Sequence, residues 1–310
     1  MKNKLIIITG PTAVGKSDLS VKLAKRINGE IISADSMQVY KGMDIGTAKI
    51  TKEKMQGVLH HLIDICDPSF DYNVYEFKKN AENAVLDIYK NGHIPIICGG
   101  TGFYIQSLLY DIDFEIEEDD GVRKKLEDMA QTPQGIIKLH ELLKEKDPEY
   151  ADTVHPNNVK RVIRALEYIE HTGNLFSEHN REQRNKESKY DFKYFVLTDD
   201  RDVMYERIDK RVELMMDEGL LDEVKTLKDS GIDKNCNSMQ AIGYKQLLSY
   251  LDGNVSLDKA VSDIKQETRH YAKRQLTWFR REKEIIFIDK RDYDHDDEKI
   301  LDHIIGECGL

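Results

Sequence analysis

The stretch Leu5-Ile6-Ile7-Ile8-Thr9-Gly10-Pro11-Thr12-Ala13-Val14-Gly15-Lys16-Ser17 decides the fold of this chain. An apolar run leads into a glycine-rich turn, and the residues from Gly10 onward fit the pattern G-x-x-x-x-G-K-[ST]. The segment that follows, Lys16–Ile27, has helical spacing, with Leu19, Leu23 and Ile27 on one face. Strand, glycine loop and helix in this order predict a phosphate-binding loop on the first strand of an α/β sheet.

The loop residues also predict how a di- or triphosphate is held. Glycines let backbone N–H groups converge on phosphate oxygens, and the helix N-terminus adds positive potential. We expect Lys16 to pair with terminal phosphate oxygens and the Ser17 hydroxyl to bind Mg²⁺. The alternative is a glycine turn that only starts a helix. The predicted phosphate-binding residues are Gly10, Pro11, Thr12, Ala13, Val14, Gly15, Lys16 and Ser17.

Further apolar runs predict the rest of the sheet. Strands are expected at Glu30–Ser33, Ile94–Cys98, Phe192–Leu197 and Ile285–Ile288, and a helix at Tyr75–Tyr89. Strands that alternate with helices are typical of a parallel sheet flanked by helices. Residues 111–120 are mostly acidic, and helical, charged sequence follows to about residue 190. We therefore predict a discontinuous P-loop catalytic core, residues 1–111 and 191–310, interrupted by a mainly helical insertion domain, residues 112–190.

Composition narrows the class of protein. The 310 residues are 40% hydrophobic and 33% charged, which fits a globular protein and excludes a disordered chain or a fibre. The net charge of −11 argues against a protein that binds any nucleic acid through bulk charge, although a local basic groove remains compatible with it. No apolar run approaches the ~18 residues of a membrane span. The four cysteines are scattered without a C-x-x-C pair, so we expect reduced thiols and a cytoplasmic protein.

A carboxylate follows the second predicted strand, where Ile31-Ile32-Ser33-Ala34 runs into Asp35. Ligands of open α/β sheets bind at the carboxyl ends of the strands, so Asp35 is expected near the phosphates as a general base for an acceptor group. The third strand ends instead in Gly99-Gly100-Thr101-Gly102, without the Mg²⁺-binding carboxylate of motors and GTPases. A helix-cap or turn role is the alternative for Asp35.

Longer segments resemble the tRNA dimethylallyltransferase family. They are GPTAVGKS (10–17), DSMQVYKGMDIGTAK (35–49), GGTGFY (99–104), HPNNVKRVIRALE (155–167), MQAIGYK (239–245) and AKRQLTWFR (272–280). The departures from the family pattern, at Ile50, Phe103 and Asn158, are peripheral to the chemistry. The zinc-finger extension of eukaryotic relatives is not part of this sequence, so the bacterial type is the closer resemblance.

The resemblance implies transfer of a dimethylallyl group from dimethylallyl diphosphate to the exocyclic N6 amine of the adenosine adjacent to the anticodon in tRNA, with release of diphosphate. It implies Asp35 as the base, Thr101 as a residue that positions the amine, and Lys16 and Arg211 as cations on the diphosphate. Arg211 falls on a helix predicted from about Val203, one turn beyond Arg207, for which a surface ion pair is the preferred interpretation.

Basic residues predict where tRNA binds. On the predicted helix Asn157–His171, Lys160, Arg161 and Arg164 lie opposite an apolar face. The segment Lys265–Glu284 is also basic, with interleaved aromatic residues, although Trp278 and Phe279 are better explained as core residues. With the residues that the resemblance adds, the predicted tRNA-binding set is Asp35, Ser36, Met37, Gln38, Thr101, Arg123, Lys160, Arg161, Arg164, Met239, Gln240, Gly243, Tyr244 and Lys245.

Two other classes of protein share part of this pattern. A P-loop small-molecule kinase that uses ATP has the phosphate loop, the strand-end carboxylate and a helical insertion, but it has no need for basic helices. A non-catalytic RNA-binding regulator has no need for the phosphate loop or Asp35. The expected partners are the tRNA anticodon stem-loop and dimethylallyl diphosphate, with Mg²⁺ as cofactor, no membrane, and a monomeric chain.

Overall fold

The structure, a computed structural model, describes residues 3–112 and 121–310. These residues form two compact units. The first unit contains the described residues up to Leu109 together with Lys189–Leu310, and the second contains those between Tyr110 and Ser188. Most of the acidic stretch predicted at residues 111–120 lies outside the described residues.

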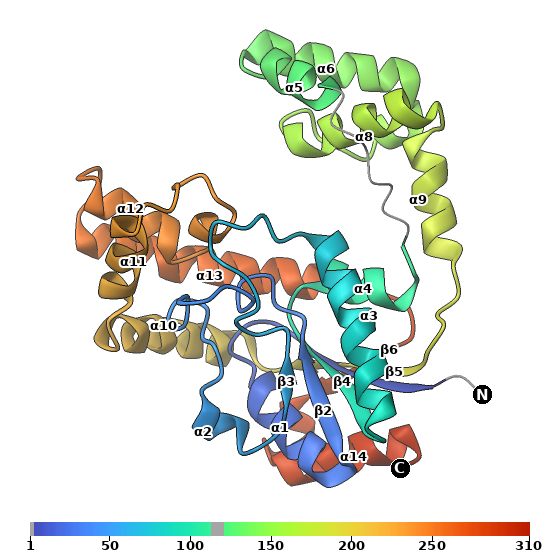
Figure 1. The fold of residues 1–310 in the computed structure, drawn as a ribbon, viewed down its shortest axis with the longest axis vertical. Coiled ribbons are helices and arrows are strands. Elements are labelled where there is room, and N and C mark those ends of the chain that lie inside the picture. The colour runs from blue at the N-terminus through green and yellow to red at the C-terminus, as the bar shows by residue number, and fades with distance from the viewer. Residues whose placement is uncertain (1–2, 113–120) are drawn as a thin grey trace. The chain divides into compact units, whose positions relative to one another are not determined.

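The first unit is built on a sheet of six parallel strands in the order β3-β2-β4-β1-β5-β6 (Figure 1). The predicted α/β class, a parallel sheet flanked by helices, is confirmed. Each predicted strand agrees with the observed one to within one residue at either end, whereas β3 is too short to show in the sequence pattern. The strands are β1 (Lys4–Thr9), β2 (Gly29–Ser33), β3 (His60–His61), β4 (Ile94–Gly99), β5 (Asp191–Thr198) and β6 (Ile285–Asp289).

Helices cover both faces of this sheet (Figure 1). α1 (Lys16–Ile27) and α14 (Asp297–Cys308) pack together on one face, and α3 (Val74–Lys90) covers the other, where it contacts α4 (Gly102–Leu109). The bounds of α1 are those predicted, because its apolar spacing and the glycine before it both mark the same start. Two short helices complete this part of the chain, α2 (Lys52–Met55) and η2 (Lys290–Tyr293).

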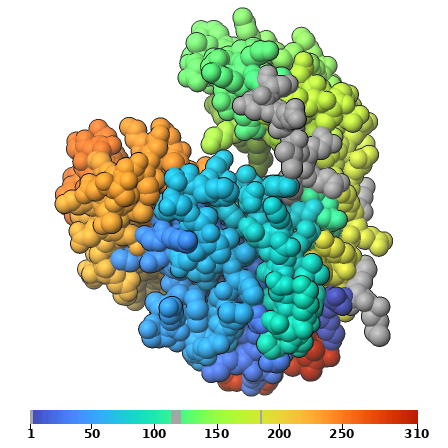
Figure 2. Space-filling model, in the orientation of Figure 1, coloured from blue at the N-terminus to red at the C-terminus, as the bar shows by residue number. Residues whose placement is uncertain are grey.

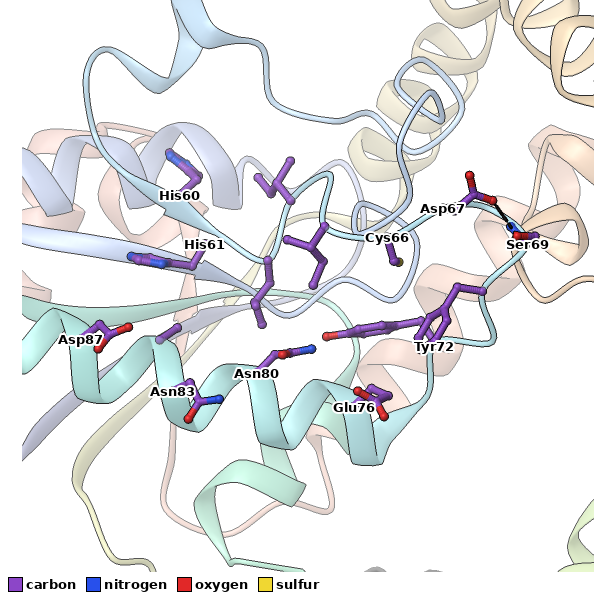
Figure 3. A pocket seen from close by; sticks show the side chains of 15 residues that line it. His60, His61, Cys66, Asp67, Ser69, Tyr72, Glu76, Asn80, Asn83 and Asp87 are labelled. Atoms are coloured by element: carbon purple, nitrogen blue, oxygen red, sulfur yellow. Dashed lines mark hydrogen bonds between the residues drawn. The ribbon is translucent and has the colours of Figure 1, made fainter. Parts of the chain in front are cut away.

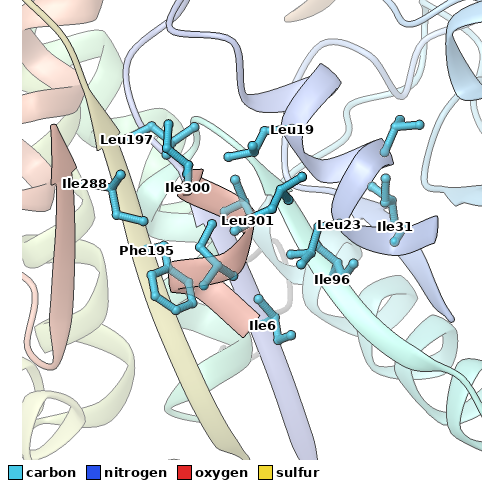
Figure 4. Close-up of a cluster of buried hydrophobic side chains, with 14 of the residues drawn as sticks. Ile6, Leu19, Leu23, Ile31, Ile96, Phe195, Leu197, Ile288, Ile300 and Leu301 are labelled. Carbon is cyan, nitrogen blue, oxygen red and sulfur yellow. The ribbon is translucent and has the colours of Figure 1, made fainter. Parts of the chain in front are cut away.

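The main core lies between the sheet and the α1–α14 layer (Figure 4). Ile6 and Ile8 alternate along β1 and both enter this core, where they meet Leu19, Leu23 and Leu301. All five side chains are at most 2% exposed. The intervening Ile7 is buried on the other face of β1, so this strand is apolar on both faces, as expected for the centre of a parallel sheet.

Between β5 and β6 the first unit forms a group of helices. They are α10 (Arg201–Asp217), α11 (Leu220–Asp229), η1 (Ser238–Gln240), α12 (Tyr244–Leu251) and α13 (Leu257–Phe279). α13 packs against α10, α12 and α4, so it connects this group to the sheet region. The sequence predicted α10 but not a separate helical group, because helical periodicity says nothing about which helices pack together.

The second unit consists of helices around a core of its own. Its helices are α5 (Val122–Met129), α6 (Pro133–Lys146), α7 (Pro148–Ala151), α8 (Val159–Thr172) and α9 (Phe176–Asn185). The apolar face predicted for α8 is buried against Leu126 of α5 and Leu139 and Leu143 of α6. This face therefore holds the unit together and leaves the polar face of α8 for solvent or a partner.

A close backbone approach joins the carboxyl ends of β2 and β4. The Ala34 N–H donates to the Cys98 carbonyl at 2.8 Å, and the Thr101 N–H donates to the Ala34 carbonyl at 3.1 Å. A Cβ atom on Gly99 would collide with the backbone of Ala34, so only glycine fits between the two strand ends. This contact places Asp35, which follows Ala34, beside Thr101.

Gly99→Ala is expected to lower the free energy of unfolding by about 1–3 kcal/mol, because rigid backbone has to move to admit the methyl group. Gly306→Ala is the matched control, since nothing lies within 4 Å of its Cβ position on α14. There the methyl should stabilise the helix by ~0.5–1 kcal/mol. Urea unfolding of both variants measures the difference, and equal stability of the two would contradict the close approach.

Candidate active site and RNA-binding surfaces

The phosphate loop forms the floor of the candidate active site, at the carboxyl end of β1. Gly10 and Gly15 have φ angles of +144° and +97°, which side-chain-bearing residues rarely adopt. A Cβ on Gly10 would also collide with the Leu197 carbonyl oxygen on β5. α1 begins directly after Gly15, so its unpaired N–H groups face the loop. The loop therefore has the geometry of an anion-binding turn.

Lys16 is the cation at the centre of this loop. Its Nζ donates to the Pro11 carbonyl at 2.8 Å. Burial lowers the pKa of Lys16 to about 8, and the neighbouring guanidinium of Arg211 acts in the same direction, against the negative charge of Asp35. Arg211 stands exposed on α10. Two cations from elements far apart in the chain thus lie close enough to influence each other, and their binding of one diphosphate stays a prediction.

Asp35 faces the loop from the end of β2. Its Oδ1 accepts from the backbone N–H groups of Met37 at 2.9 Å and Gln38 at 3.4 Å, so the turn role left open by the sequence is also present. Burial raises the pKa of Asp35, while these N–H groups and the charge of Lys16 oppose the rise. One carboxylate can serve both as the acceptor of the turn and as a base, because only Oδ1 accepts from the turn N–H groups and Oδ2 stays available.

The strands β5 and β6 also lead into acidic residues, but those are engaged in ion pairs. Asp199 binds Arg207 at 2.7 Å, and Asp289 binds Arg291 at 2.6 Å. In the part of the chain that the structure describes, Asp35 has no ion-pair partner. The ion pair preferred for Arg207 is confirmed, although its partner is a fully buried carboxylate. Asp35 is therefore the strand-end acid that remains available for chemistry.

Thr101 adjoins Asp35 and begins α4, where its carbonyl accepts from the Tyr104 N–H at 3.0 Å. Its hydroxyl oxygen is buried. The phenol of Tyr271, from α13, lies within reach of this hydroxyl: burial raises the pKa of the phenol, the charge of Asp35 adds to the rise, and the interaction with Thr101 opposes it. Thr101 was predicted as a site residue, whereas Tyr271 was predicted only as part of a basic, aromatic segment.

Gln275 of α13 joins the two glycine loops, and the sequence did not single it out. Its Oε1 accepts from the Thr12 N–H at 2.9 Å, and its Nε2 donates to the Gly100 carbonyl at 3.0 Å. The side chain is only 6% exposed. The one signal for Gln275 in the sequence was its place in the AKRQLTWFR segment. A single glutamine on a helix has no chemical feature that would predict hydrogen bonds to two distant loops.

The aromatic residues after Gln275 divide between core and site. Phe279 is fully buried, which confirms the core interpretation. Trp278 is half-buried and packs so closely over Gly102, at the start of α4, that a Cβ there would collide with the indole ring. Its ring also meets Phe103 edge-on, with the centroids 6.1 Å apart. Trp278 thus packs against the loop that carries Thr101. This role is intermediate between that of a core residue and that of an aromatic residue at an RNA-binding surface.

The residues after Asp35 make internal hydrogen bonds. Ser36, Met37 and Gln38 are half-buried. The Gln38 Nε2 lies 3.3 Å from the Thr47 carbonyl, to which it donates, and the Gln38 Oε1 accepts from the Ser33 hydroxyl at 3.2 Å. Direct reading of a base by this amide remains a prediction, and it requires these hydrogen bonds to exchange.

The MQAIGYK segment is mostly interior. Met239 and Tyr244 are fully buried and Gly243 is buried, whereas Gln240 and Lys245 are exposed. The tRNA contacts predicted for the segment remain predictions, and in this structure only the exposed pair offers side-chain surface for them. The side chains of Met239 and Tyr244 are directed into the protein interior.

In the second unit, the predicted basic patch on α8 is smaller than the sequence suggests. Arg123 of α5 binds Glu167 through two hydrogen bonds, at 2.8 and 2.7 Å, and Arg164 lies 3.4 Å from the same carboxylate. In the sequence, the acidic residues before Arg123 already weaken its prediction as a tRNA contact, whereas its pairing with Glu167 is a tertiary contact that the sequence does not show. Lys160 and Arg161 are exposed and have no ion-pair partner among the described residues.

Two further features complete the survey of the described residues. Within residues 3–112 and 121–310, no group of three or more His, Cys, Asp or Glu side chains could hold a metal ion, and no helix could cross a bilayer.

A cavity of about 950 Å³ lies along α3 and β3, with Asn80, Asn83 and Tyr72 on its wall (Figure 3). It contains none of the predicted site residues.

Comparison with known proteins decides the family. The family described as IPP transferase matches residues 38–282. The chain is 56% identical, over 94% of its length and 93% of the relative, to a tRNA dimethylallyltransferase of Lachnoclostridium phytofermentans. It is 49% identical to one of Bacillus subtilis, over 100% of its own length and 99% of the relative. The chain belongs to the IPP transferase family.

Solved structures of this family have the same fold. The full-length tRNA isopentenylpyrophosphate transferase of Bacillus halodurans superimposes with a TM-score of 0.74 at 46% identity, covering 99% of this chain and 97% of the other. A eukaryotic dimethylallyltransferase that acts on tRNA gives 0.78 at 33% identity, covering 93% and 74%. The family match begins at Gln38, so the phosphate loop and Asp35 precede it, and their functional assignment depends on the geometry described above.

The lowered pKa of Lys16 predicts how diphosphate affinity depends on pH. Above about pH 8 the free protein has lost this proton and must take it up again on binding, so affinity should fall by up to tenfold per pH unit. In Lys16→Arg the cation stays charged, so this decline should vanish. Calorimetric titration with diphosphate between pH 7 and 9.5 measures both, and parallel pH profiles for the two proteins would contradict the assignment.

Proposed function

We propose that this chain transfers a dimethylallyl group from dimethylallyl diphosphate to the exocyclic N6 amine of the adenosine adjacent to the anticodon in tRNA, releasing diphosphate. The observation that carries the proposal is the identity of 49–56% with tRNA dimethylallyltransferases over nearly the whole chain. The site agrees with it, because an anion-binding loop and a buried carboxylate face each other at the strand ends.

The leaving group is the part of the reaction that the phosphate loop serves. The N6 lone pair forms a bond to the allylic carbon, and the carbon–oxygen bond breaks with its electrons going to diphosphate. Lys16, Arg211 and the loop N–H groups stabilise the charge that builds up on the diphosphate oxygens. The Ser17 hydroxyl would hold Mg²⁺ together with phosphate oxygens and water, and the ion would neutralise part of that charge.

The acceptor is activated on the other side of the site. The amine carries an extra proton once it has formed the new bond, and Asp35 accepts this proton. The raised pKa of Asp35 suits it to this step near neutral pH. The Thr101 hydroxyl, which is buried beside the Tyr271 phenol, would hydrogen-bond near the amine and orient it.

The adenosine would reach this site only after it has left the stack of the anticodon loop, because the N6 amine of a stacked base is not accessible to protein side chains. The loop after Asp35 and the exposed cations of α8 are the surfaces that we assign to the tRNA. We assign the chain to the cytoplasm, where both substrates are available, and expect it to act as a monomer.

The test of this function is incubation with unmodified tRNA, Mg²⁺ and labelled dimethylallyl diphosphate, alongside labelled ATP. Label from the allyl donor is expected in the RNA, and ATP is expected to remain intact. The opposite outcome, with ATP consumed and the RNA unlabelled, supports the small-molecule kinase instead.

Asp35→Asn should lower turnover in this assay by ~10²–10⁴-fold and change tRNA affinity little. Asparagine retains an oxygen for the Met37 and Gln38 N–H groups, so the turn persists while the base is lost. Asp289→Asn, at the end of β6, serves as the control and should retain near-normal turnover. Unimpaired turnover in Asp35→Asn removes this residue as the base.

Reversal of charge on α8 tests the RNA surface. Lys160→Glu with Arg161→Glu should weaken tRNA binding and make its salt dependence shallower by about 1–2 in the log–log slope, because two cations no longer displace counterions from phosphates. The control Lys90→Glu with Lys299→Glu, on α3 and α14, changes the net charge of the protein by the same amount. It should alter neither the tRNA affinity nor its salt dependence. Filter binding at several salt concentrations measures the slopes, and identical slopes place the tRNA elsewhere.

A further inference from the structure

A single carboxylate holds the loop at residues 44–46. The Glu223 side chain, from α11, accepts at Oε2 from the N–H groups of Asp44 and Ile45, both at 2.8 Å, and at Oε1 from the Gly46 N–H at 3.1 Å. Three successive N–H groups that converge on one anion form a backbone nest. Here the anion belongs to the protein itself, so the nest attaches the loop to the helical group.

Tyr244 completes this attachment. Its hydroxyl donates to the Glu223 Oε1 at 2.5 Å, and its ring is fully buried. The ring lies so close to Gly46 that a Cβ there would come within 2.7 Å of its atoms, so the loop and the ring fit only with glycine at that position. Burial and the charge of Glu223 both raise the pKa of Tyr244, which keeps the phenol as a donor.

The loop that Glu223 holds continues toward the candidate base. The carbonyl groups of Thr47 and Ala48 accept from the Gln38 Nε2, at 3.3 and 3.5 Å. The Gln38 N–H in turn donates to the Asp35 carboxylate. Hydrogen bonds, together with the backbone of residues 46–48 and of Gln38, thus link α11 to the end of β2. On the surface, a blue part of the chain borders the gold part (Figure 2).

We propose that Glu223, together with Tyr244, is a positioning residue for the transfer reaction. Its carboxylate sets the loop at residues 44–48, and through Gln38 it sets the orientation of the Asp35 carboxylate toward the acceptor. This inference rests on the proposed function for its catalytic part, whereas the effect on the loop is independent of it. Glu223 lies outside every segment by which the sequence resembles the family, and it touches neither the phosphate loop nor Thr101.

Glu223→Gln tests the proposal without changing the size of the side chain. The amide has a single acceptor oxygen, and its NH₂ group must face either the loop N–H groups or Gly46 and Tyr244, so the loop loses its anchor. Turnover should fall by about 10–100-fold, because small misplacement of reacting groups has effects of this size. Diphosphate affinity should stay unchanged, and amide hydrogen exchange at residues 44–48 should accelerate.

Two further variants separate positioning from stability. Glu223→Asp keeps the negative charge and should recover part of the turnover. Glu213→Gln, which removes the ion pair between the exposed Glu213 of α10 and Lys265 of α13, should leave turnover and exchange unchanged. Normal turnover in Glu223→Gln overturns the proposal. So does a loss of diphosphate binding in parallel with turnover, since that indicates general unfolding. If the wild-type chain modifies no tRNA, the proposed function fails, while exchange at residues 44–48 still reports on the attachment.

Discussion

The arrangement of the site depends on the close contact between the ends of β2 and β4. Parallel strands end at the same edge of a sheet, but three strand ends can meet around one ligand only if their backbones approach closely. Glycine at position 99 allows this approach, because no side chain separates it from Ala34. Asp35 and Thr101 then lie beside the phosphate loop of β1, and Gln275 ties the loops of β1 and β4 together from a distant helix.

Burial shifts the pKa values of the two central side chains, Lys16 and Asp35, in opposite directions. It lowers the pKa of Lys16 and raises the pKa of Asp35, so in both cases it disfavours the charged form. The folded chain thus maintains a cation and an anion that are each less favourable than in water. In the reaction that we propose, a bound diphosphate would compensate for the first, and a proton taken from the amine would neutralise the second. Lys16 and Asp35 are therefore suited to a reaction in which negative charge develops on the diphosphate and a proton leaves the amine.

Local patterns account for the parts that could be predicted. Lys16–Ile27 was predicted with its observed bounds, because apolar spacing and a preceding glycine are both local signals. Glu223, Tyr271 and the partners of Glu167 could not be predicted in the same way. Each depends on a side chain that meets a segment tens of residues away, and no periodicity along the chain encodes such a meeting. Gln275 was visible only as a member of a segment that resembles a family.

The sequence by itself determined the class of fold, the phosphate loop and the family, since these follow from short-range pattern and from motifs in a fixed order. Only the tertiary structure decided which charges remain available. It paired Arg123 with Glu167, used Glu223 to hold a backbone loop, and left Asp35 without an ion-pair partner in the described part of the chain. The reason is physical: a charge acts on whatever lies within a few ångströms of it, and folding alone sets those distances.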